Sequence, residues 1–268
     1  MACHIKMLRS VSAVFRLIDD FTGKVLKDAS FFFLSNGKRI PHIRKPEGFF
    51  VLADMEESRD LKITICSPCY CNYVIPGLSF PTENKNIITA RLKPGVNYPV
   101  RPGASAYSVC FTHSGGRPAT GLAIELYAPF KDGAVKLKVI HNSDNGVYAS
   151  LSNPYGLDYT GFTLAVPSPD KSDLPLVFSL ASRKDSTSFR IDRPLPKLPA
   201  SGCTVKRVYS SVCDSAGRAL IPVDYIAGSE NPDAMEAQLH AFNGANSYFR
   251  DISLSRGCIK HFNEVLDW

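Results

Sequence analysis

The stretch that decides the fold class is Val14–Phe32, which reads VFRLIDDFTGKVLKDASFF. Two similar stretches follow it, Val109–Leu126 with VCFTHSGGRPATGLAIEL and Val208–Ile226 with VYSSVCDSAGRALIPVDYI. Each contains an extended apolar run, a polar turn with Gly-Lys or Gly-Arg, and a small or apolar pair that leads into a second extended run. The chain therefore repeats one structural pattern three times.

The glycine of each repeat marks a tight turn between two strands. Gly23, Gly116 and Gly217 lie about 100 residues apart, which is the size of one β-sandwich domain. Glycine supplies the positive φ that a tight turn needs, and the β-branched and aromatic residues around it suit strands that are buried on one face. The repeat predicts an all-β chain of tandem β-sandwich modules, with positive φ at all three glycines.

Further strands follow the turn in the first two repeats. Leu61–Ile65 and Phe162–Val166 alternate between apolar and other side chains, as a half-buried strand does. Ile87–Leu92 and Leu176–Arg183 are similar apolar stretches that end their units.

The third repeat continues differently. Residues 231–244, NPDAMEAQLHAFNG, combine an N-cap, a proline at the first helical position, early acidic residues and a closing glycine. Met235, Leu239 and Phe242 have the spacing of one helix face. The pattern predicts one short amphipathic helix that packs these three residues over the open face of an abbreviated module.

Proline-rich stretches indicate where the modules join. They are Pro94–Gly103 and Arg193–Pro199, and such stretches act as semi-rigid spacers. The predicted modules are residues 1–99, 100–196 and 197–268.

In the first two repeats a turn glycine then precedes an aromatic strand, in Pro46–Val51 and Asp144–Ala149. This order of strand, Gly-Lys or Gly-Arg turn, strand, turn glycine and aromatic strand resembles the carboxypeptidase regulatory-like domain. That domain is a transthyretin-like (prealbumin-like) β-sandwich, so the resemblance implies tandem transthyretin-like or immunoglobulin-like sandwiches, with the short helix in the third. The joint Leu92–Pro99 is also similar to joints of bacterial proteins that carry such domains in tandem, some of them linked to phage-tail-like contractile assemblies. The fold class itself hosts many functions.

The positive charge of the chain is modest. The formal net charge is +6, and its densest part is the stretch 37–46, where one glycine and two prolines predict a loop and not a groove-reading helix. Lys38, Arg39, Arg44 and Lys45 are the candidate contacts for an acidic partner, and a solvated loop is the alternative interpretation. No nucleic-acid partner is expected.

The distribution of apolar residues and cysteines bears on the compartment. No apolar run approaches the roughly 20 residues that span a bilayer, and the N-terminus does not have the pattern of a signal peptide. A cytoplasmic protein is therefore expected, which could also be incorporated into a particle that leaves the cell. The eight cysteines are expected to be reduced thiols in that compartment.

The strongest candidate for a chemical site is Cys66-Ser67-Pro68-Cys69-Tyr70-Cys71. Structural zinc usually takes four ligands from two such pairs, and a second pair is missing from the sequence. The cysteines are therefore interpreted as small apolar residues around a Ser-Pro turn, with a metal site or a redox pair as alternatives. Neither a metal nor a cofactor is expected, and without nucleotide-binding or hydrolase motifs the chain is not predicted to be an enzyme.

The sequence thus favours a non-catalytic structural or adaptor protein that contacts other protein subunits of a larger assembly, with copies of the same chain as an alternative partner. A carbohydrate-binding or adhesion module is the alternative function, and Tyr155 and Tyr159 would carry it, although core or rim packing is the favoured use of these tyrosines. The last segment, 259–268, is expected to contact the second module or another chain, because Trp268 would otherwise expose a large apolar ring.

Overall fold

The computed structural model describes residues 10–27, 30–55, 58–80, 87–130, 135–143, 146–152, 158–166, 174–192, 195, 199, 201–223, 234–244 and 246–268. The chain forms two compact units, Met1–Tyr98 and Pro99–Trp268. All regular secondary structure in the described residues is β-strand, so the all-β prediction is confirmed. No helix among these residues could cross a membrane.

The first unit contains two four-stranded sheets, β4-β5-β1-β8 and β3-β2-β6-β7. Strand β1 lies between β5, which runs antiparallel to it, and β8, which runs parallel. The strands are β1 (Val11–Asp19), β2 (Phe32–Ser35), β3 (Lys38–Ile40), β4 (Ile43–Arg44), β5 (Phe49–Ala53), β6 (Ser58–Cys66), β7 (Tyr73–Phe80) and β8 (Ile87–Leu92).

Both sheets of the first unit contribute to one core. Phe15 on β1 packs against Phe33 on β2 with ring centroids 5.2 Å apart, and Phe33 lies 6.0 Å from Phe50 on β5. Leu17 and Ile63 are buried in the same cluster. Because the alternating residues of two sheets meet in this way, the unit is a β-sandwich.

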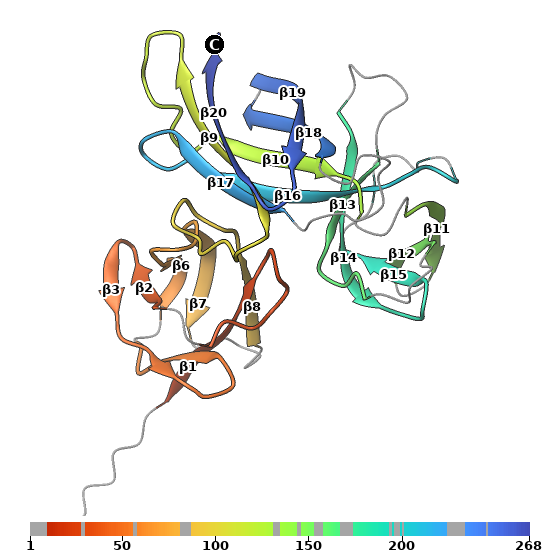
Figure 1. The fold of residues 1–268 in the computed structure, drawn as a ribbon. Helices are drawn as coiled ribbons and strands as arrows, with labels where there is room; N and C mark the ends of the chain where they lie inside the picture. The colour runs from red at the N-terminus through yellow and green to blue at the C-terminus, as the bar shows by residue number, and fades with distance from the viewer. Residues whose placement is uncertain are drawn as a thin grey trace, which may run out of the picture. The chain divides into compact units, whose positions relative to one another are not determined.

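The second unit has a three-stranded sheet, β17-β9-β20, and a nine-stranded sheet, β11-β12-β15-β14-β13-β16-β10-β18-β19 (Figure 1). Its strands are β9 (Ser105–His113), β10 (Ala123–Ala128), β11 (Leu137–Ser143), β12 (Gly146–Leu151), β13 (Thr163–Val166), β14 (Leu176–Arg183), β15 (Ser188–Ile191), β16 (Lys206–Val212), β17 (Arg218–Val223), β18 (Ala234–Asn243), β19 (Asn246–Ser255) and β20 (Ile259–Leu266).

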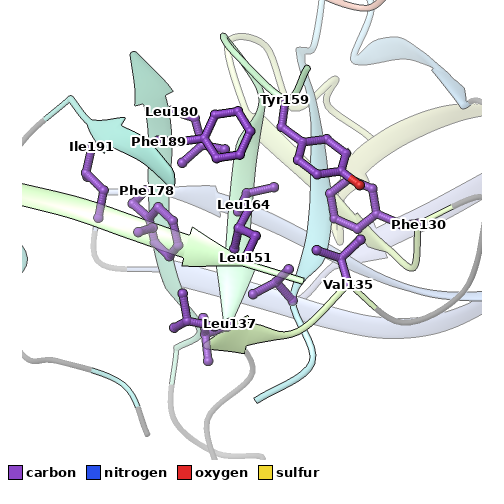
Figure 2. Close-up of a cluster of buried hydrophobic side chains, with 13 residues drawn as sticks. Phe130, Val135, Leu137, Leu151, Tyr159, Leu164, Phe178, Leu180, Phe189 and Ile191 are labelled. Atoms are coloured by element: carbon purple, nitrogen blue, oxygen red, sulfur yellow. The ribbon is translucent and has the colours of Figure 1, made fainter. Parts of the chain in front are cut away.

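One end of the nine-stranded sheet, β11 to β15, has a hydrophobic core of its own. Figure 2 shows Tyr159 beside Phe130, and the two ring centroids lie 5.3 Å apart. Leu164, Phe178 and Phe189 belong to the same buried cluster. Tyr159 is only 2% exposed, which confirms the core packing expected for it.

The second and third sequence repeats interlock in the other part of this unit. Strands β9 and β10 follow each other around the Gly116 turn, and β16 and β17 follow each other around the Gly217 turn. Strand β9 pairs with β17, and β10 pairs with β16, both antiparallel. Strands from both sides of the predicted boundary at residue 196 therefore share the two sheets.

All three repeat glycines have the expected backbone. The φ angles are +68° at Gly23, +76° at Gly116 and +75° at Gly217, which confirms the prediction.

The predicted helix at residues 231–244 is wrong. Residues 231–233 lie outside the described residues, and Ala234–Asn243 is strand β18, which lies between β10 and β19 in the sheet. Met235 and Leu239 fit a helix face, but Ala237 and Ala241 complete an equally regular alternation that fits a strand. Pairing on both sides of β18 satisfies its backbone and decides between the two patterns.

The C-terminal segment confirms one of its two predicted contacts. Strand β20 runs parallel to β9 and pairs with it from Ile259 opposite Ala106 to Leu266 opposite His113 (Figure 1). Residues 259–266 therefore contact the strand that opens the second predicted module.

Candidate interaction surface

Strands β18 and β19 form a long hairpin at the edge of the nine-stranded sheet. Asn243 pairs with Asn246, so the hairpin turns over two residues, and the first of them, Gly244, has a φ of +59°. Glycine at the first central position favours such a turn because it readily adopts positive φ. The hairpin carries three of the predicted interaction residues.

These three residues divide between the two faces of β18. Met235 and Leu239 are buried on the inner face, and Leu239 has no exposed surface. Phe242 lies on the outer face and is partly buried. Within this chain, Met235 and Leu239 therefore belong to the core of the unit.

A connected group of polar side chains lies on the outer face of β10, β18 and β19. The Tyr127 hydroxyl donates to Glu125 Oε2 at 2.6 Å and lies 3.0 Å from His240 Nδ1. His240 Nε2 lies 3.3 Å from Ser247 Oγ. Burial and the Glu125 carboxylate raise the pKa of Tyr127, which keeps this phenol protonated. With Tyr127 donating to Glu125, Nδ1 of His240 is the donor to the Tyr127 oxygen, and in the neutral imidazole Nε2 is then the acceptor for the Ser247 hydroxyl.

Two aromatic rings hold the His240 imidazole in place. Phe249, its cross-strand neighbour on β19, is stacked on it with centroids 4.2 Å apart and an interplanar angle of 2°. Phe242 stacks at 4.6 Å. His240 is only 5% exposed as a result.

The Ser247 and His240 pair has two parts of a nucleophilic site, a hydroxyl and a base. Ser247 lies in the regular ladder between β18 and β19, opposite Phe242. We interpret the polar chain as a clamp that fixes the outer face of the hairpin.

The inner face of β19 is fixed to β20 by a buried carboxylate. Glu264 is 4% exposed, accepts a hydrogen bond from the Tyr248 hydroxyl at 2.8 Å, and forms an ion pair with Arg250. The Glu264 carboxylate raises the pKa of Arg250, and burial followed by the bond to Glu264 raises the pKa of Tyr248. Since a buried charge needs such partners, these contacts hold β19 at a defined position.

In the C-terminal half of β19, the carbonyl groups that point away from β18 already accept hydrogen bonds. Lys260 Nζ donates to the Ser253 carbonyl at 2.7 Å, and Ser105 Oγ donates to the Ser255 carbonyl at 3.0 Å. The N-terminal half is exposed, and Phe249 has 41% of its surface accessible. The accessible part of this edge is therefore Ser247–Asp251.

The predicted basic contacts lie in the first unit. Lys38 and Arg39 are exposed on β3 and Arg44 on β4, with Lys45 directly after it. Strand β3 is at the edge of one sheet and β4 at the edge of the other, so this stretch includes short edge strands where the sequence predicts a loop. The Arg39 guanidinium lies 5.3 Å from the Phe32 ring centroid.

His42 links this basic stretch to the core. Its ring lies 5.1 Å from Phe33 and 5.7 Å from Phe50. Burial, and then the charge of Arg39, lower the pKa of His42. The imidazole is therefore part of the packing between β3 and β4.

Trp268 is partly buried at the end of the chain. Its backbone carbonyl accepts a hydrogen bond from His113 Nδ1 at 2.8 Å. This contact places the terminal residue beside the Gly116 turn.

The cysteine cluster takes the form of a strand end and a bend. Cys66 is buried at the end of β6, where burial raises the pKa of its thiol. Cys69 N–H bonds to Ser67 Oγ at 3.3 Å, and Cys71 Sγ lies 3.3 Å from the Pro94 carbonyl. Within the described residues, no three histidine, cysteine or acidic side chains are placed to hold a metal ion.

The sequence reasoning missed the residues that shape this surface. They are Glu125, Tyr127, His240, Ser247, Phe249, Arg250 and Glu264. The hairpin around Asn243-Gly244 could have been found from the alternation on both sides of that pair. The contacts to β10 join distant parts of the chain, and the Glu264 contacts arise only when β20 packs against the inner face of β19, so neither has a local signal.

In comparisons with known proteins, no family model, no curated protein and no solved structure matches this chain.

Proposed function

We propose that this chain is a non-catalytic structural or adaptor protein that binds other protein chains in a larger assembly. The observation that carries the proposal is the edge of β19, where Ser247–Asp251 is exposed at the end of a nine-stranded sheet. An uncovered strand edge offers backbone donors and acceptors to another strand.

The rigidity of this edge supports a binding role. The outer face is held by the His240 chain, and the inner face by Glu264. A strand that is ordered before binding loses less conformational entropy when a partner adds to it. The exposed ring of Phe249 adds an apolar contact of the kind enriched at interfaces.

The assembly is expected to be a particle of the phage-tail-like contractile kind, on the strength of the resemblance in the joint and the repeats. Carbohydrate binding gains no support from the tyrosines, since Tyr159 is buried in a core and Tyr155 lies outside the described residues. The structural role is therefore the function that we carry forward.

The test is the size of the native complex. The tagged chain, expressed in its source cells and extracted without denaturant, should sediment far ahead of a free 29.4 kDa chain. Phe249→Asp should release it from that complex. Val265→Asp, which changes an exposed side chain on β20, is the matched control and should leave the complex intact. A chain that sediments alone in all three forms would overturn the proposal.

A further inference from the structure

We infer that the partner at the β19 edge is a second copy of the same chain, which adds its own β19 antiparallel and in a register centred on Phe249. The inference rests on the proposed function and names the partner at its binding edge. Three features of the strand lead to it: the direction of its backbone groups, the order of its side chains and the exclusion of neighbouring registers.

The direction of the backbone groups follows from the hairpin. In a two-residue hairpin the pair next to the turn, Asn243 and Asn246, is hydrogen-bonded, and bonded and non-bonded pairs then alternate. Ser247, Phe249 and Asp251 are therefore in non-bonded pairs, so their N–H and C=O groups point to the free edge.

Two further contacts agree with this direction. The carbonyl groups of Ser253 and Ser255, which continue the same odd-numbered series, point away from β18 to Lys260 and Ser105. The close stacking of His240 and Phe249 also fits a non-bonded pair, in which the side chains approach most closely.

The side chains of the exposed stretch are complementary to themselves about a twofold axis at Phe249. Two Phe249 rings come side by side, and an aromatic pair across strands is stabilising. Each Ser247 then lies opposite Asp251 of the second copy, so this pair brings no like charges together. Each Tyr248 lies opposite Arg250 of the second copy, which allows a guanidinium to stack on a phenol ring.

The neighbouring registers are less favourable for physical reasons. A register centred on Arg250 would use backbone groups that already bond to Leu239 on β18, and would place two like charges together. One centred on Asp251 places two carboxylates directly opposite each other. One centred on Ser247 leaves only the end of the strand beside the turn to pair. The Phe249 register alone combines free backbone groups with compatible side chains.

The first measurement is the oligomeric state of the purified full-length chain by sedimentation equilibrium and native mass spectrometry. A dimer is expected that dissociates on dilution. Phe249→Asp should weaken it by about 100-fold, because like charges would then meet at the axis. Val265→Asp should leave the dimer unchanged, and circular dichroism should show that both variants remain folded.

The second measurement tests the register by cysteine crosslinking, with Cys258→Ser as the background because Cys258 is exposed. Phe249→Cys should form an intermolecular disulfide under mild oxidation, since the residue faces its own copy at a distance that a disulfide can bridge. Ser247→Cys alone should not crosslink, but it should do so when mixed with Asp251→Cys.

The results separate this inference from the proposed function. A monomer at all concentrations, a dimer that Phe249→Asp does not weaken, or efficient crosslinking of Ser247→Cys to itself would each overturn the second copy as partner. If the purified chain is monomeric but sediments in a large complex in its source cells, the self-pairing fails while the structural role stands.

Discussion

The Gly116 turn and the Gly217 turn have one backbone conformation in two different surroundings. Their φ angles are +76° and +75°. In the first, His113 N–H donates to the Arg117 carbonyl at 2.8 Å, and in the second Asp214 N–H donates to Arg218 at 2.8 Å. Local sequence therefore produced nearly the same turn twice.

The space around the two glycines differs completely. A Cβ at Gly116 would meet nothing within 4 Å, whereas a Cβ at Gly217 would lie 2.3 Å from the Phe111 carbonyl oxygen. The reason is the interlocking of the repeats, in which Phe111 N–H donates to the Gly217 carbonyl. Gly116 thus serves only its turn, whereas Gly217 serves its turn and also allows two repeats to pack closely.

Replacing the repeat glycines by alanine should give the largest contrast. At Gly23 and Gly116 the positive φ should cost roughly 1 kcal/mol. At Gly217 the clash with the Phe111 backbone should bring the loss to about 3 kcal/mol or more. Urea unfolding measures the loss in the free energy of unfolding, and hydrogen exchange shows whether β9 and β17 are the strands affected. Equal losses at the three sites would contradict the tight contact at Gly217.

The three turns also differ in the contacts of the residue with which each turn begins. In the first unit this residue is Asp19, whose buried carboxylate accepts the N–H groups of Phe21 and Thr22 and the hydroxyls of Tyr98, at 2.7 Å, and Tyr70, at 3.2 Å. Asp19→Ala should lose about 2 to 3 kcal/mol, because several buried donors lose their acceptor.

Two tyrosine variants control this prediction. Tyr98→Phe should lose part of the stability that Asp19→Ala loses. The two losses should not add, because both variants remove the same hydrogen bond between Tyr98 and Asp19. Tyr73→Phe changes a tyrosine that packs on the same core and should have little effect. Chemical denaturation of the full chain gives the values for the three single variants and for the Asp19→Ala, Tyr98→Phe double variant, and additive losses in the double variant would show that Asp19 and Tyr98 act separately.

His113 opens the Gly116 turn and bonds to the last residue of the chain. Removing its bond to the Trp268 carbonyl with His113→Ala should cost about 1 kcal/mol. The loss should appear as faster hydrogen exchange at the C-terminal end of β20. Unchanged exchange there would mean that this contact does not hold the chain end, and Gly217 turn residues should be unaffected in any case.

Asp214 opens the Gly217 turn and should show the smallest effect, with a dependence on pH. Burial acts to raise the pKa of Asp214, but bonds from the N–H groups of Arg218 and Ala216 and from the Arg218 guanidinium lower it below 3.8. A carboxylate with a lowered pKa stabilises the fold above its unfolded pKa, and this stabilisation is lost as the pH falls through the folded pKa.

Asp214→Asn should therefore be less stable than the wild type by under about 1 kcal/mol at neutral pH, as is usual for partly exposed pairs. The difference should begin to shrink as the pH falls below about 4, near the unfolded pKa, and should disappear once the pH is below the lowered folded pKa. Thermal melts of both proteins between pH 2 and 7 would measure it, and a difference that persists in acid would assign the effect to shape and not to charge.

Residues 234–243 show how far sequence reasoning reaches. Met235, Leu239 and Phe242 support a helix, while Met235, Ala237, Leu239 and Ala241 support a strand, so local periodicity alone does not decide. The partners β10 and β19 decide it, and β10 is more than a hundred residues earlier in the chain. The sequence did not reveal the candidate surface because it did not predict strand β18. His240 and Phe249 face each other only when both hairpin strands are formed.

The sequence alone determined the features that depend on neighbouring residues. The all-β class follows from alternating apolar residues, and the three turns follow from Gly23, Gly116 and Gly217, since positive φ is a property of one residue and its neighbours. Only the tertiary structure decided which strands pair. That β9 lies between β17 and β20, that Glu264 is buried against β19, and that the edge at Phe249 stays open all depend on which segments pack together in the folded chain. Such contacts are selected by the packing of the whole sheet, because each strand could satisfy its backbone with several partners.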